Sequence, residues 1–325
     1  MSEEKLTRAA VVTGGSRGIG RAVCVALAKQ GCNVVVNYCH GEAAAAETAA
    51  LCKELGVEAV TVQADVSTAE GCKKLFEEAV NAFGRVDILV NNAGVTRDNL
   101  ILRLSEEDFD TVLNANLKGA FLCCKEAARR MVRQRYGRIV NLSSVVGLRG
   151  NPGQANYVAA NMALEALADK LRIKGMQAYV IGWGPVGDVG MLLANPQARR
   201  LLENTLGTPA LASDDVLNAM ETVISAREPS SHFFAIDWSR VQKLPVVREA
   251  RFEGIWKRMG HSAVQSVSMA ELLSGKSTEE AVATLADLIA QEVAKLMGIS
   301  VKELNVHQPI SDIGMDSLMV VELAV

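Results

Sequence analysis

Short apolar runs alternate with longer helical stretches through the first half of the chain. The apolar run at residues 9–14 ends in glycine, and residues 19–30 then space Ile19, Val23 and Leu27 at helical intervals. The same alternation repeats to about residue 182. It predicts an α/β fold, a Rossmann-type doubly wound parallel sheet with helices on both faces.

Further elements follow the same pattern. Strands are predicted at 33–37, 58–63, 88–90, 138–142 and 177–181, and helices at 42–55, 69–83, 106–131 and 155–174. Residues 182–206 are rich in glycine and proline, with one apolar helix candidate, and suit a loop-and-lid region beside a ligand. A helix at 214–226 and a final edge strand at 232–237 complete the predicted sheet.

Length and composition indicate one large domain with an appendage. The 325 residues are enough for one large core of roughly 250 residues and for a smaller additional segment. We expect a domain at 1–260, a Ser-, Gly- and Ala-containing linker at 261–277, and a second segment at 278–325 that begins with an amphipathic helix at 278–297.

Charge and hydropathy limit the class of partner. A net charge of -3 argues against nucleic acid or an anionic membrane as the main partner. The start of the chain does not resemble a signal peptide, and no apolar run has the length of a membrane span, so we expect a cytoplasmic protein. The seven cysteines lack paired Cys-x-x-Cys spacing, and we expect them to be buried free thiols. The four histidines lack the spacing of a metal site, so no metal is expected.

A glycine-rich stretch, TGGSRGIG at residues 13–20, lies between the first predicted strand and helix. Glycines let the backbone approach a pyrophosphate, and the amino end of the helix presents unpaired N–H groups to its negative charge. The candidate cofactor-binding residues in this loop are Gly14, Ser16, Arg17, Gly18, Ile19 and Gly20.

Two further motifs follow in order: Asp65 and Val66 end the third strand, and NNAG at 91–94 follows the fourth. With the glycine loop, this order and spacing resemble the short-chain dehydrogenase/reductase family. The resemblance implies that Asp65 holds an adenine and that Asn91 supports the sheet. Further cofactor contacts are then expected at Asn37, Val66, Asn92, Ala93, Gly94 and Pro185.

The end of the second strand bears on the choice of cofactor. Asn37-Tyr38-Cys39 contains no carboxylate to accept a hydrogen bond from a ribose 2′-hydroxyl, so a 2′-phosphate is not repelled. Arg17 can supply positive charge for that phosphate, which favours NADPH over NADH. The alternative is that Arg17 is a solvated loop residue.

Residues 8–157 resemble the 3-oxoacyl-(acyl carrier protein) reductases within this family. The likeness lies in NANLKG at 114–119, SVVG at 144–147 and GQANY at 153–157. It implies that Ser144 orients the carbonyl of a β-ketoacyl thioester while Tyr157 donates the proton. Asn116 would hold a water of the proton relay.

Asn161 occupies the position where this family has a lysine. A phenol of pKa about 10 is a weak acid–base group near neutral pH unless a nearby cation stabilises its phenolate. Polyketide ketoreductases place Asn at this position and Lys at the position of Asn116, whereas this chain has Asn at both. Lys118 lies two residues further along the helix, about 200° around its axis, and is expected to point away.

Two interpretations follow. The chain is a slow or unusual reductase in which the positive nicotinamide ring and water partly replace the lysine. Alternatively, it is a catalytically inert scaffold that binds NADPH or an acyl carrier protein.

From Tyr157 onward the sequence looks like a polyketide ketoreductase, as in GWGP at 182–185 and IDWS at 236–239. The stretch DIGMDSL at 312–318 follows a helix and a loop, and resembles an acyl carrier domain in which Ser317 carries phosphopantetheine. Because the chain stops at Val325, we expect this carrier domain to be truncated.

A basic cluster near residues 129–138 suggests a protein partner. Arg135 and Lys174 resemble the family positions that dock the acidic carrier protein; the alternative is a solvated helix face. Family resemblance also implies a homo-oligomer, a tetramer or dimer, built from the helices at 106–131 and 155–174.

Overall fold

The computed structural model describes residues 7–151, 153–189, 192–193, 195–241, 258, 273, 275–297 and 301. The chain divides into two compact units, Met1–Asp237 and Trp238–Val325. Within the described residues, no helix is both long and apolar enough to cross a membrane.

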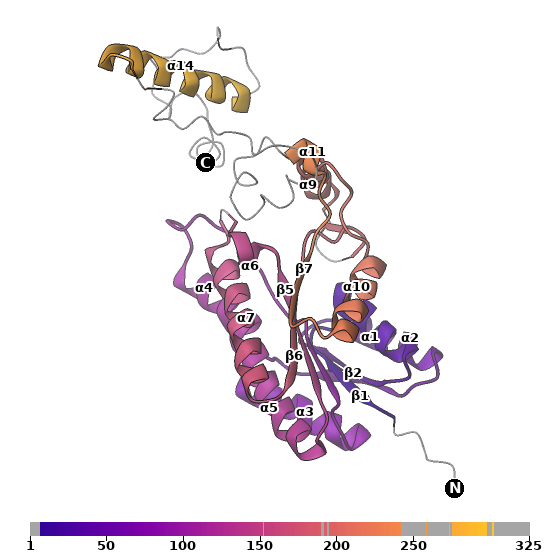
Figure 1. Ribbon diagram of the computed structural model, residues 1–325. Coiled ribbons are helices and arrows are strands. Elements are labelled where there is room, and N and C mark those ends of the chain that lie inside the picture. The colour runs from indigo at the N-terminus through magenta and orange to yellow at the C-terminus, as the bar shows by residue number, and fades with distance from the viewer. Residues whose placement is uncertain are drawn as a thin grey trace. The chain divides into compact units, whose positions relative to one another are not determined.

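The first unit is built on a sheet of seven parallel strands in the order β3-β2-β1-β4-β5-β6-β7 (Figure 1). The strands are β1 Ala9–Val12, β2 Asn33–Tyr38, β3 Ala59–Gln63, β4 Ile88–Asn91, β5 Arg138–Ser144, β6 Gln177–Trp183 and β7 Ser230–Phe233. The order reverses between β1 and β4, and the crevice at such a point is where ligands bind in open α/β sheets. The predicted fold class is confirmed.

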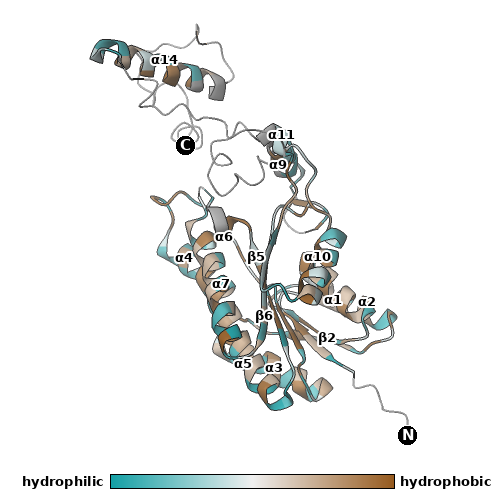
Figure 2. Cartoon of the chain, viewed as in Figure 1, coloured by the Kyte–Doolittle hydropathy of each residue, from teal (hydrophilic) through white to brown (hydrophobic). Residues whose placement is uncertain are grey.

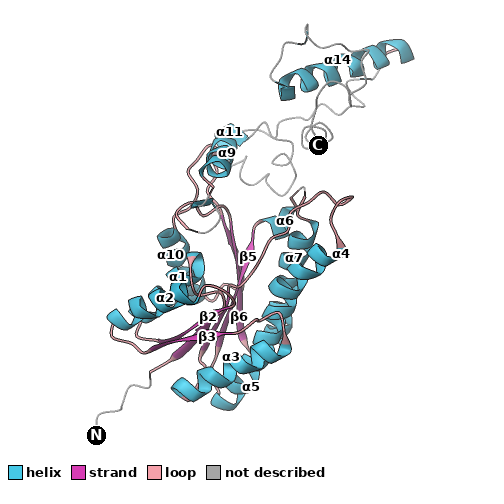
Figure 3. Ribbon diagram, turned by 180° about the vertical axis from the view of Figure 1, so that it is seen from behind, coloured by secondary structure: helices cyan, strands magenta, loops and turns pink. Residues whose placement is uncertain are grey.

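Helices cover both faces of this sheet (Figure 3). The helices of this unit include α1 Gly18–Lys29, α2 Glu42–Glu54, α3 Ala69–Phe83, α4 Glu106–Leu113, α5 Gly119–Gln134, α6 Val146–Arg149, α7 Ala155–Ile173, α9 Pro196–Leu206 and α10 Ser213–Ala226. Those that pack on the sheet are α1, α2 and α10 on one face and α3, α5 and α7 on the other. One apolar cluster joins the sheet to α1, α2 and α10, and another joins it to α3, α5 and α7. The flanking helices carry both hydrophilic and hydrophobic residues, as amphipathic helices packed on a sheet require (Figure 2).

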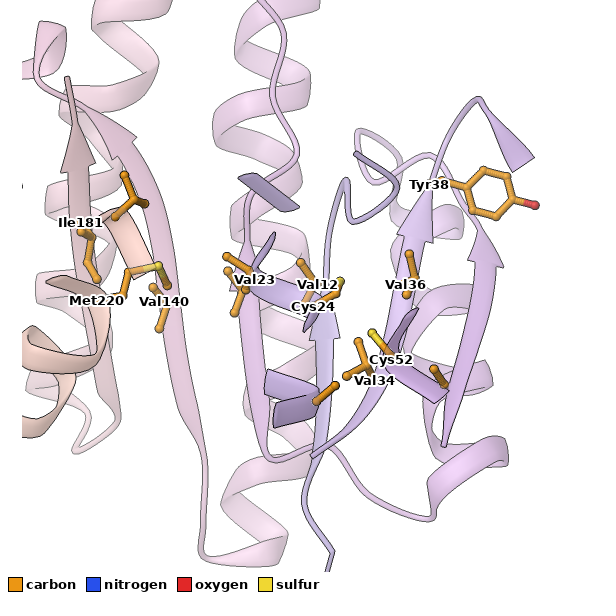
Figure 4. Close-up of a cluster of buried hydrophobic side chains, with 14 of the residues drawn as sticks. Val12, Val23, Cys24, Val34, Val36, Tyr38, Cys52, Val140, Ile181 and Met220 are labelled. Carbon is orange, nitrogen blue, oxygen red and sulfur yellow. The ribbon is translucent and has the colours of Figure 1, made fainter. Parts of the chain in front are cut away.

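Neighbouring residues of a strand reach opposite clusters. Val12, Val34 and Val36 lie in the cluster beneath α1, α2 and α10 (Figure 4), whereas Val11 and Val35 lie in the other. All five side chains are fully buried. A parallel sheet covered on both faces therefore explains why these strands read as continuous apolar runs.

The single helix predicted at 106–131 is interrupted. A π-helical segment, η1 Asn114–Lys118, separates α4 from α5. A π-helical turn contains one more residue than an α-helical turn, and the helix continues in the same direction after it. The spacing of apolar residues therefore did not reveal the interruption. The predicted edge strand at 232–237 is β7, which lies at the edge as expected but covers Ser230–Phe233.

The described part of the second unit comprises α11 Trp238–Val241, α14 Thr278–Met297 and a few single residues. Ser277 caps α14: its side chain accepts a hydrogen bond from the Glu280 N–H at 3.2 Å, and the Glu280 carboxylate accepts one from the Ser277 N–H at 2.9 Å. This reciprocal pair is a capping box. It explains why the amphipathic helix predicted at 278–297 begins where it does.

Candidate active site

The glycine-rich loop takes a conformation that glycine alone adopts readily. Gly14 and Gly18 have positive φ angles of 62° and 58°. A Cβ atom on Gly20 would lie 2.2 Å from the main-chain oxygen of Gly14. The first turn of α1 therefore packs against the loop at a spacing that excludes any side chain at Gly20.

The amino end of α1 can receive an anion. Within the described loop, no side chain caps the helix, and its first turn contains no acidic residue. Arg17 is the N-cap residue and is exposed. Unpaired N–H groups and a nearby guanidinium fit the pyrophosphate and the 2′-phosphate expected from the sequence.

Asn37 braces the loop from the end of β2. Its amide oxygen accepts from the Gly14 N–H at 3.3 Å, and its amide nitrogen donates to the main-chain oxygens of Val62 at 3.3 Å and Ala64 at 3.0 Å. The residue is only 2% exposed. Asn37 therefore positions the loop, and both ends of its amide are already engaged.

Asn92 and Ala93 fasten the same loop from the end of β4. The Asn92 amide donates to the main-chain oxygens of Thr13 at 2.8 Å and Gly14 at 3.0 Å. The Thr13 hydroxyl accepts from the N–H groups of Asn92 and Ala93. The NNAG motif thus holds the glycine loop against the centre of the sheet.

Asp65 and Val66 follow β3. Asp65 is exposed and its carboxylate accepts from the Ser67 N–H at 2.9 Å, whereas Val66 is buried. They lie at the carboxyl edge of the sheet with the glycine loop, because the strands are parallel. That placement is compatible with the adenine-binding role expected from the family.

Ser144 and Tyr157 meet at the carboxyl end of β5. Ser144 is the last residue of β5, and Tyr157 lies in the first turn of α7. The pKa of the Tyr157 phenol is raised, chiefly because the group is buried, and the charge of Asp98 adds to the increase. Hydrogen bonds from Asn161 and Ser144 lower the pKa but do not cancel this effect. The structure therefore brings together the predicted serine, tyrosine and asparagine.

Asn161 is held in place as a neutral structural residue. Its amide oxygen accepts from the Ser143 hydroxyl at 3.1 Å, and its nitrogen donates to the Tyr157 main-chain oxygen at 2.8 Å. It is 4% exposed. Among the described residues, the groups that lower the pKa of Tyr157 are neutral, and Lys118 donates instead to the Asn114 side chain from an exposed position.

Asn116 lies in η1 and clamps the chain after the NNAG turn. Its amide oxygen accepts from the Val95 N–H at 2.8 Å, and its nitrogen donates to the Val95 oxygen at 2.9 Å. The amide oxygen and the amide nitrogen can each make one more hydrogen bond, so the relay water expected at Asn116 stays a prediction. Residue spacing did not indicate these two bonds, because they join residues 21 positions apart.

Three residues that sequence reasoning did not select organise the rim of the site. The Gln154 amide donates to the Asp98 carboxylate at 2.8 Å. The buried Asn156 donates to the Arg97 main-chain oxygen at 3.0 Å and accepts from the Tyr157 N–H at 2.8 Å. The bonds to Asp98 and Arg97 tie the loop after β4 to the start of α7. They join residues 56 and 59 positions apart in the sequence, so no local signal revealed them.

Pro185 follows β6, whose last residue Trp183 pairs with Ser144, so it lies at the same carboxyl edge of the sheet as the site. Its main-chain oxygen accepts from the Leu211 N–H at 2.8 Å.

Two other predicted residues lie at the opposite edge of the sheet. Arg135 and Lys174 are the C-cap residues of α5 and α7, at the amino ends of the strands. Since α7 is 19 residues long, about 28 Å separates its two ends. The structure therefore does not place Arg135 and Lys174 beside Tyr157 of the same chain. The predicted attachment residue Ser317 lies outside the described residues.

The sheet order, the phosphate-compatible loop and the Ser–Tyr pair define a dinucleotide-binding oxidoreductase of the α/β class. A family model described as short chain dehydrogenase matches residues 8–184, and one described as phosphopantetheine attachment site matches residues 287–325. The chain belongs to the short-chain dehydrogenase family. Its predicted carrier-type C-terminal segment is confirmed by the second match.

Several curated relatives are similar over the first half of the chain. The 3-oxoacyl-(acyl-carrier-protein) reductase FabG of Staphylococcus aureus (strain MW2) is 49% identical over 184 residues, 55% of this chain and 75% of the relative. The enzyme of the same name from Staphylococcus epidermidis is 41% identical over 203 residues, 61% of this chain and 83% of the relative. These matches confirm the predicted resemblance to this group of reductases.

A solved structure supports the same fold. A crystal structure described as a short-chain alcohol dehydrogenase from Sinorhizobium meliloti 1021 has a TM-score of 0.62 and 32% sequence identity. The match covers 69% of this chain and 92% of that chain.

Proposed function

We propose that the protein reduces a carrier-bound 3-oxoacyl thioester to the 3-hydroxyacyl thioester with NADPH, in fatty-acid or polyketide synthesis. The observation that carries this proposal is the meeting of Ser144 and Tyr157 at the carboxyl edge of the sheet, on the edge that also bears the glycine loop. The names of the reductase relatives support the substrate class.

NADPH fits the residues that would hold it. The loop has no room for side chains at Gly20, α1 is uncapped within the described residues, and Arg17 is exposed beside it. Asn37 places no negative charge at the end of β2. When bound, the nicotinamide would supply a hydride to the ketone carbon.

The chain's own residues would handle the ketone oxygen. The Ser144 hydroxyl would donate a hydrogen bond to it and fix its position, and Tyr157 would deliver the proton as negative charge develops there. Reduction requires the protonated phenol, and the raised pKa of Tyr157 keeps that form populated at neutral pH. The phenol is nonetheless a weaker acid than one beside a lysine.

The rival proposal is an inert scaffold that binds NADPH or a carrier protein without turnover. It rests on Asn161, whose amide is committed to Ser143 and to the Tyr157 main chain and which carries no charge. A thioester assay combined with a direct binding titration separates the two. Binding with turnover supports the reductase, and binding without turnover supports the scaffold.

The second unit would supply or receive the acyl group. We propose that Ser317, in the phosphopantetheine-site match, carries the phosphopantetheine arm. The proposed organisation is a reductase domain at 1–260, a linker at 261–277 and a carrier segment at 278–325. Intact-mass measurement after treatment with a phosphopantetheinyl transferase and coenzyme A, with Ser317→Ala as control, tests the attachment site.

Self-association is also proposed. An apolar groove runs between η1, the helices on either side of it and α7, lined by Leu113, Asn114, Leu117, Lys118, Phe121 and Leu167. Phe121, which lines this groove, is 48% exposed. Light scattering of the full chain would show a dimer or tetramer, and Phe121→Glu would dissociate it.

A further inference from the structure

Two buried thiols touch on the face of the sheet covered by α3 and α5. Cys72 in α3 and Cys123 in α5 are each 0% exposed, and their sulfur atoms are 3.6 Å apart. Both belong to the apolar cluster beneath these helices. The proposed reductase mechanism uses neither of them.

Close backbone packing brings the two helices together at this point. A Cβ atom on Gly71 would lie 2.0 Å from the main-chain oxygen of Asp65, and one on Gly119 would lie 3.0 Å from that of Val66. The amino ends of α3 and α5 therefore press against the same short stretch of backbone after β3. This packing holds the helix backbones that carry the two thiols close to each other.

The two thiols are chemically unequal. The hydrogen bond from Cys123 lowers the pKa of Cys72 against the opposing effect of burial. The same bond, together with burial, raises the pKa of Cys123. Since the thiolate is the nucleophile in thiol oxidation, Cys72 is the thiol that reacts first.

We propose that Cys72 and Cys123 are an oxidative modification site that hydrogen peroxide converts reversibly to a disulfide. The Cys72 thiolate attacks one peroxide oxygen, the O–O bond breaks, and hydroxide leaves, so that Cys72 becomes a sulfenic acid. The Cys123 sulfur then attacks the Cys72 sulfur. The S–S bond forms, the S–O bond breaks, and the departing hydroxide takes the Cys123 proton as water.

Each peroxide thus gains two electrons and yields two waters after protonation, and the two sulfurs are oxidised together. A disulfide needs sulfurs about 2.0 Å apart, so the two side chains must approach by a rotamer adjustment alone or with a small helix shift. Since both thiols are 0% exposed, hydrogen peroxide would have to enter through local opening of the first turn of α3.

Oxidation also changes the backbone beside the proposed adenine site. The Cys72 thiol donates a hydrogen bond to the Val66 main-chain oxygen at 3.1 Å. A disulfide removes this donor and draws Cys72 toward α5, next to Asp65 and Val66. Weaker binding of NADPH is expected, and this part of the inference rests on the proposed function.

The experiment uses the full chain treated with hydrogen peroxide and then quenched. Peptide mapping by mass spectrometry without reductant should recover a Cys72–Cys123 cross-linked peptide lighter by two hydrogens, which dithiothreitol reverses. The matched control is Cys39→Ser, which removes an exposed thiol and should leave the cross-link unchanged. Cys72→Ser and Cys123→Ser should each abolish it.

Direct NADPH titration of the oxidised chain should show binding about three- to tenfold weaker, the effect of losing roughly one hydrogen bond, with recovery on reduction. The site is refuted if both thiols remain free, or pair with other cysteines, under conditions that oxidise Cys39. A cross-link that forms while the reduced chain binds no NADPH would confirm the modification site and contradict the proposed cofactor site.

Discussion

Replacing Asn161 with lysine tests what the missing cation does. Asn161 lies one helical turn after Tyr157, and its side chain already acts on the pKa of that phenol. A lysine ammonium there would lie within several ångströms of the phenol oxygen. An opposite charge at about 4–6 Å typically lowers an acid's pKa by about 1–3 units.

The gain in acidity competes with a loss of stability. The substitution removes the hydrogen bonds to Ser143 and to the Tyr157 main chain, each worth about 1 kcal/mol, and it buries a charge. We therefore expect Asn161→Lys to lower the free energy of unfolding by about 2–4 kcal/mol. If the remainder of the site is intact, the rate of thioester reduction should rise by about 10²- to 10⁴-fold, the usual range for general acid–base catalysis.

Asn161→Met is the matched control, since it has similar length without charge. The assay follows NADPH absorbance with a β-ketoacyl thioester at fixed pH, with stability measured by urea denaturation of the same samples. An equal rate for the Lys and Met variants, both folded, would refute the reasoning, because the charge would then make no difference to the proton donor.

Three other changes have defined outcomes. Gly20→Ala should abolish detectable NADPH binding in a fluorescence titration while α-helical circular dichroism is retained, because its Cβ would lie 2.2 Å from the Gly14 oxygen. The rate of reduction should stay level from pH 7 to about 10 and decline only as the pH rises through the raised pKa of Tyr157, and Asn161→Lys should move that decline to lower pH. Burial alone would raise the pKa of Glu165, but hydrogen bonds from His232 and Ser230 hold it below its usual value. The resulting stability is present above about pH 4.5 and is lost as the pH falls through the folded-state pKa, so thermal melts of Glu165→Gln should lose that acid-side dependence.

Most of the fold could be predicted because the strands are buried on both faces. Runs such as VVVN in β2 are typical of strands in a parallel sheet that is covered by helices on both faces. The limits of α3 and α14 were predicted to the residue, since Thr68 and Ser277 cap them. The interruption at η1 and the hydrogen bonds between Asn116 and Val95 could not be predicted, because these bonds join residues 21 positions apart in the sequence.

The site was predictable to the level of residue identity but not of role. The resemblance to the family identified Ser144, Tyr157 and Asn161, and the structure brings them together. It could not show that the amide of Asn161 is occupied by Ser143, because that contact joins a strand to a helix 18 residues later. The placement of Arg135 and Lys174 likewise depends on where α5 and α7 end relative to the sheet.

The central claim is that Ser144 and Tyr157 form a working reductase site without the lysine. The most direct measurement follows NADPH oxidation by the full chain with a small β-ketoacyl thioester, in parallel with an NADPH-binding titration on the same sample. We predict binding together with slow turnover that Tyr157→Phe eliminates. Binding with no turnover, or turnover that survives Tyr157→Phe, would contradict the claim.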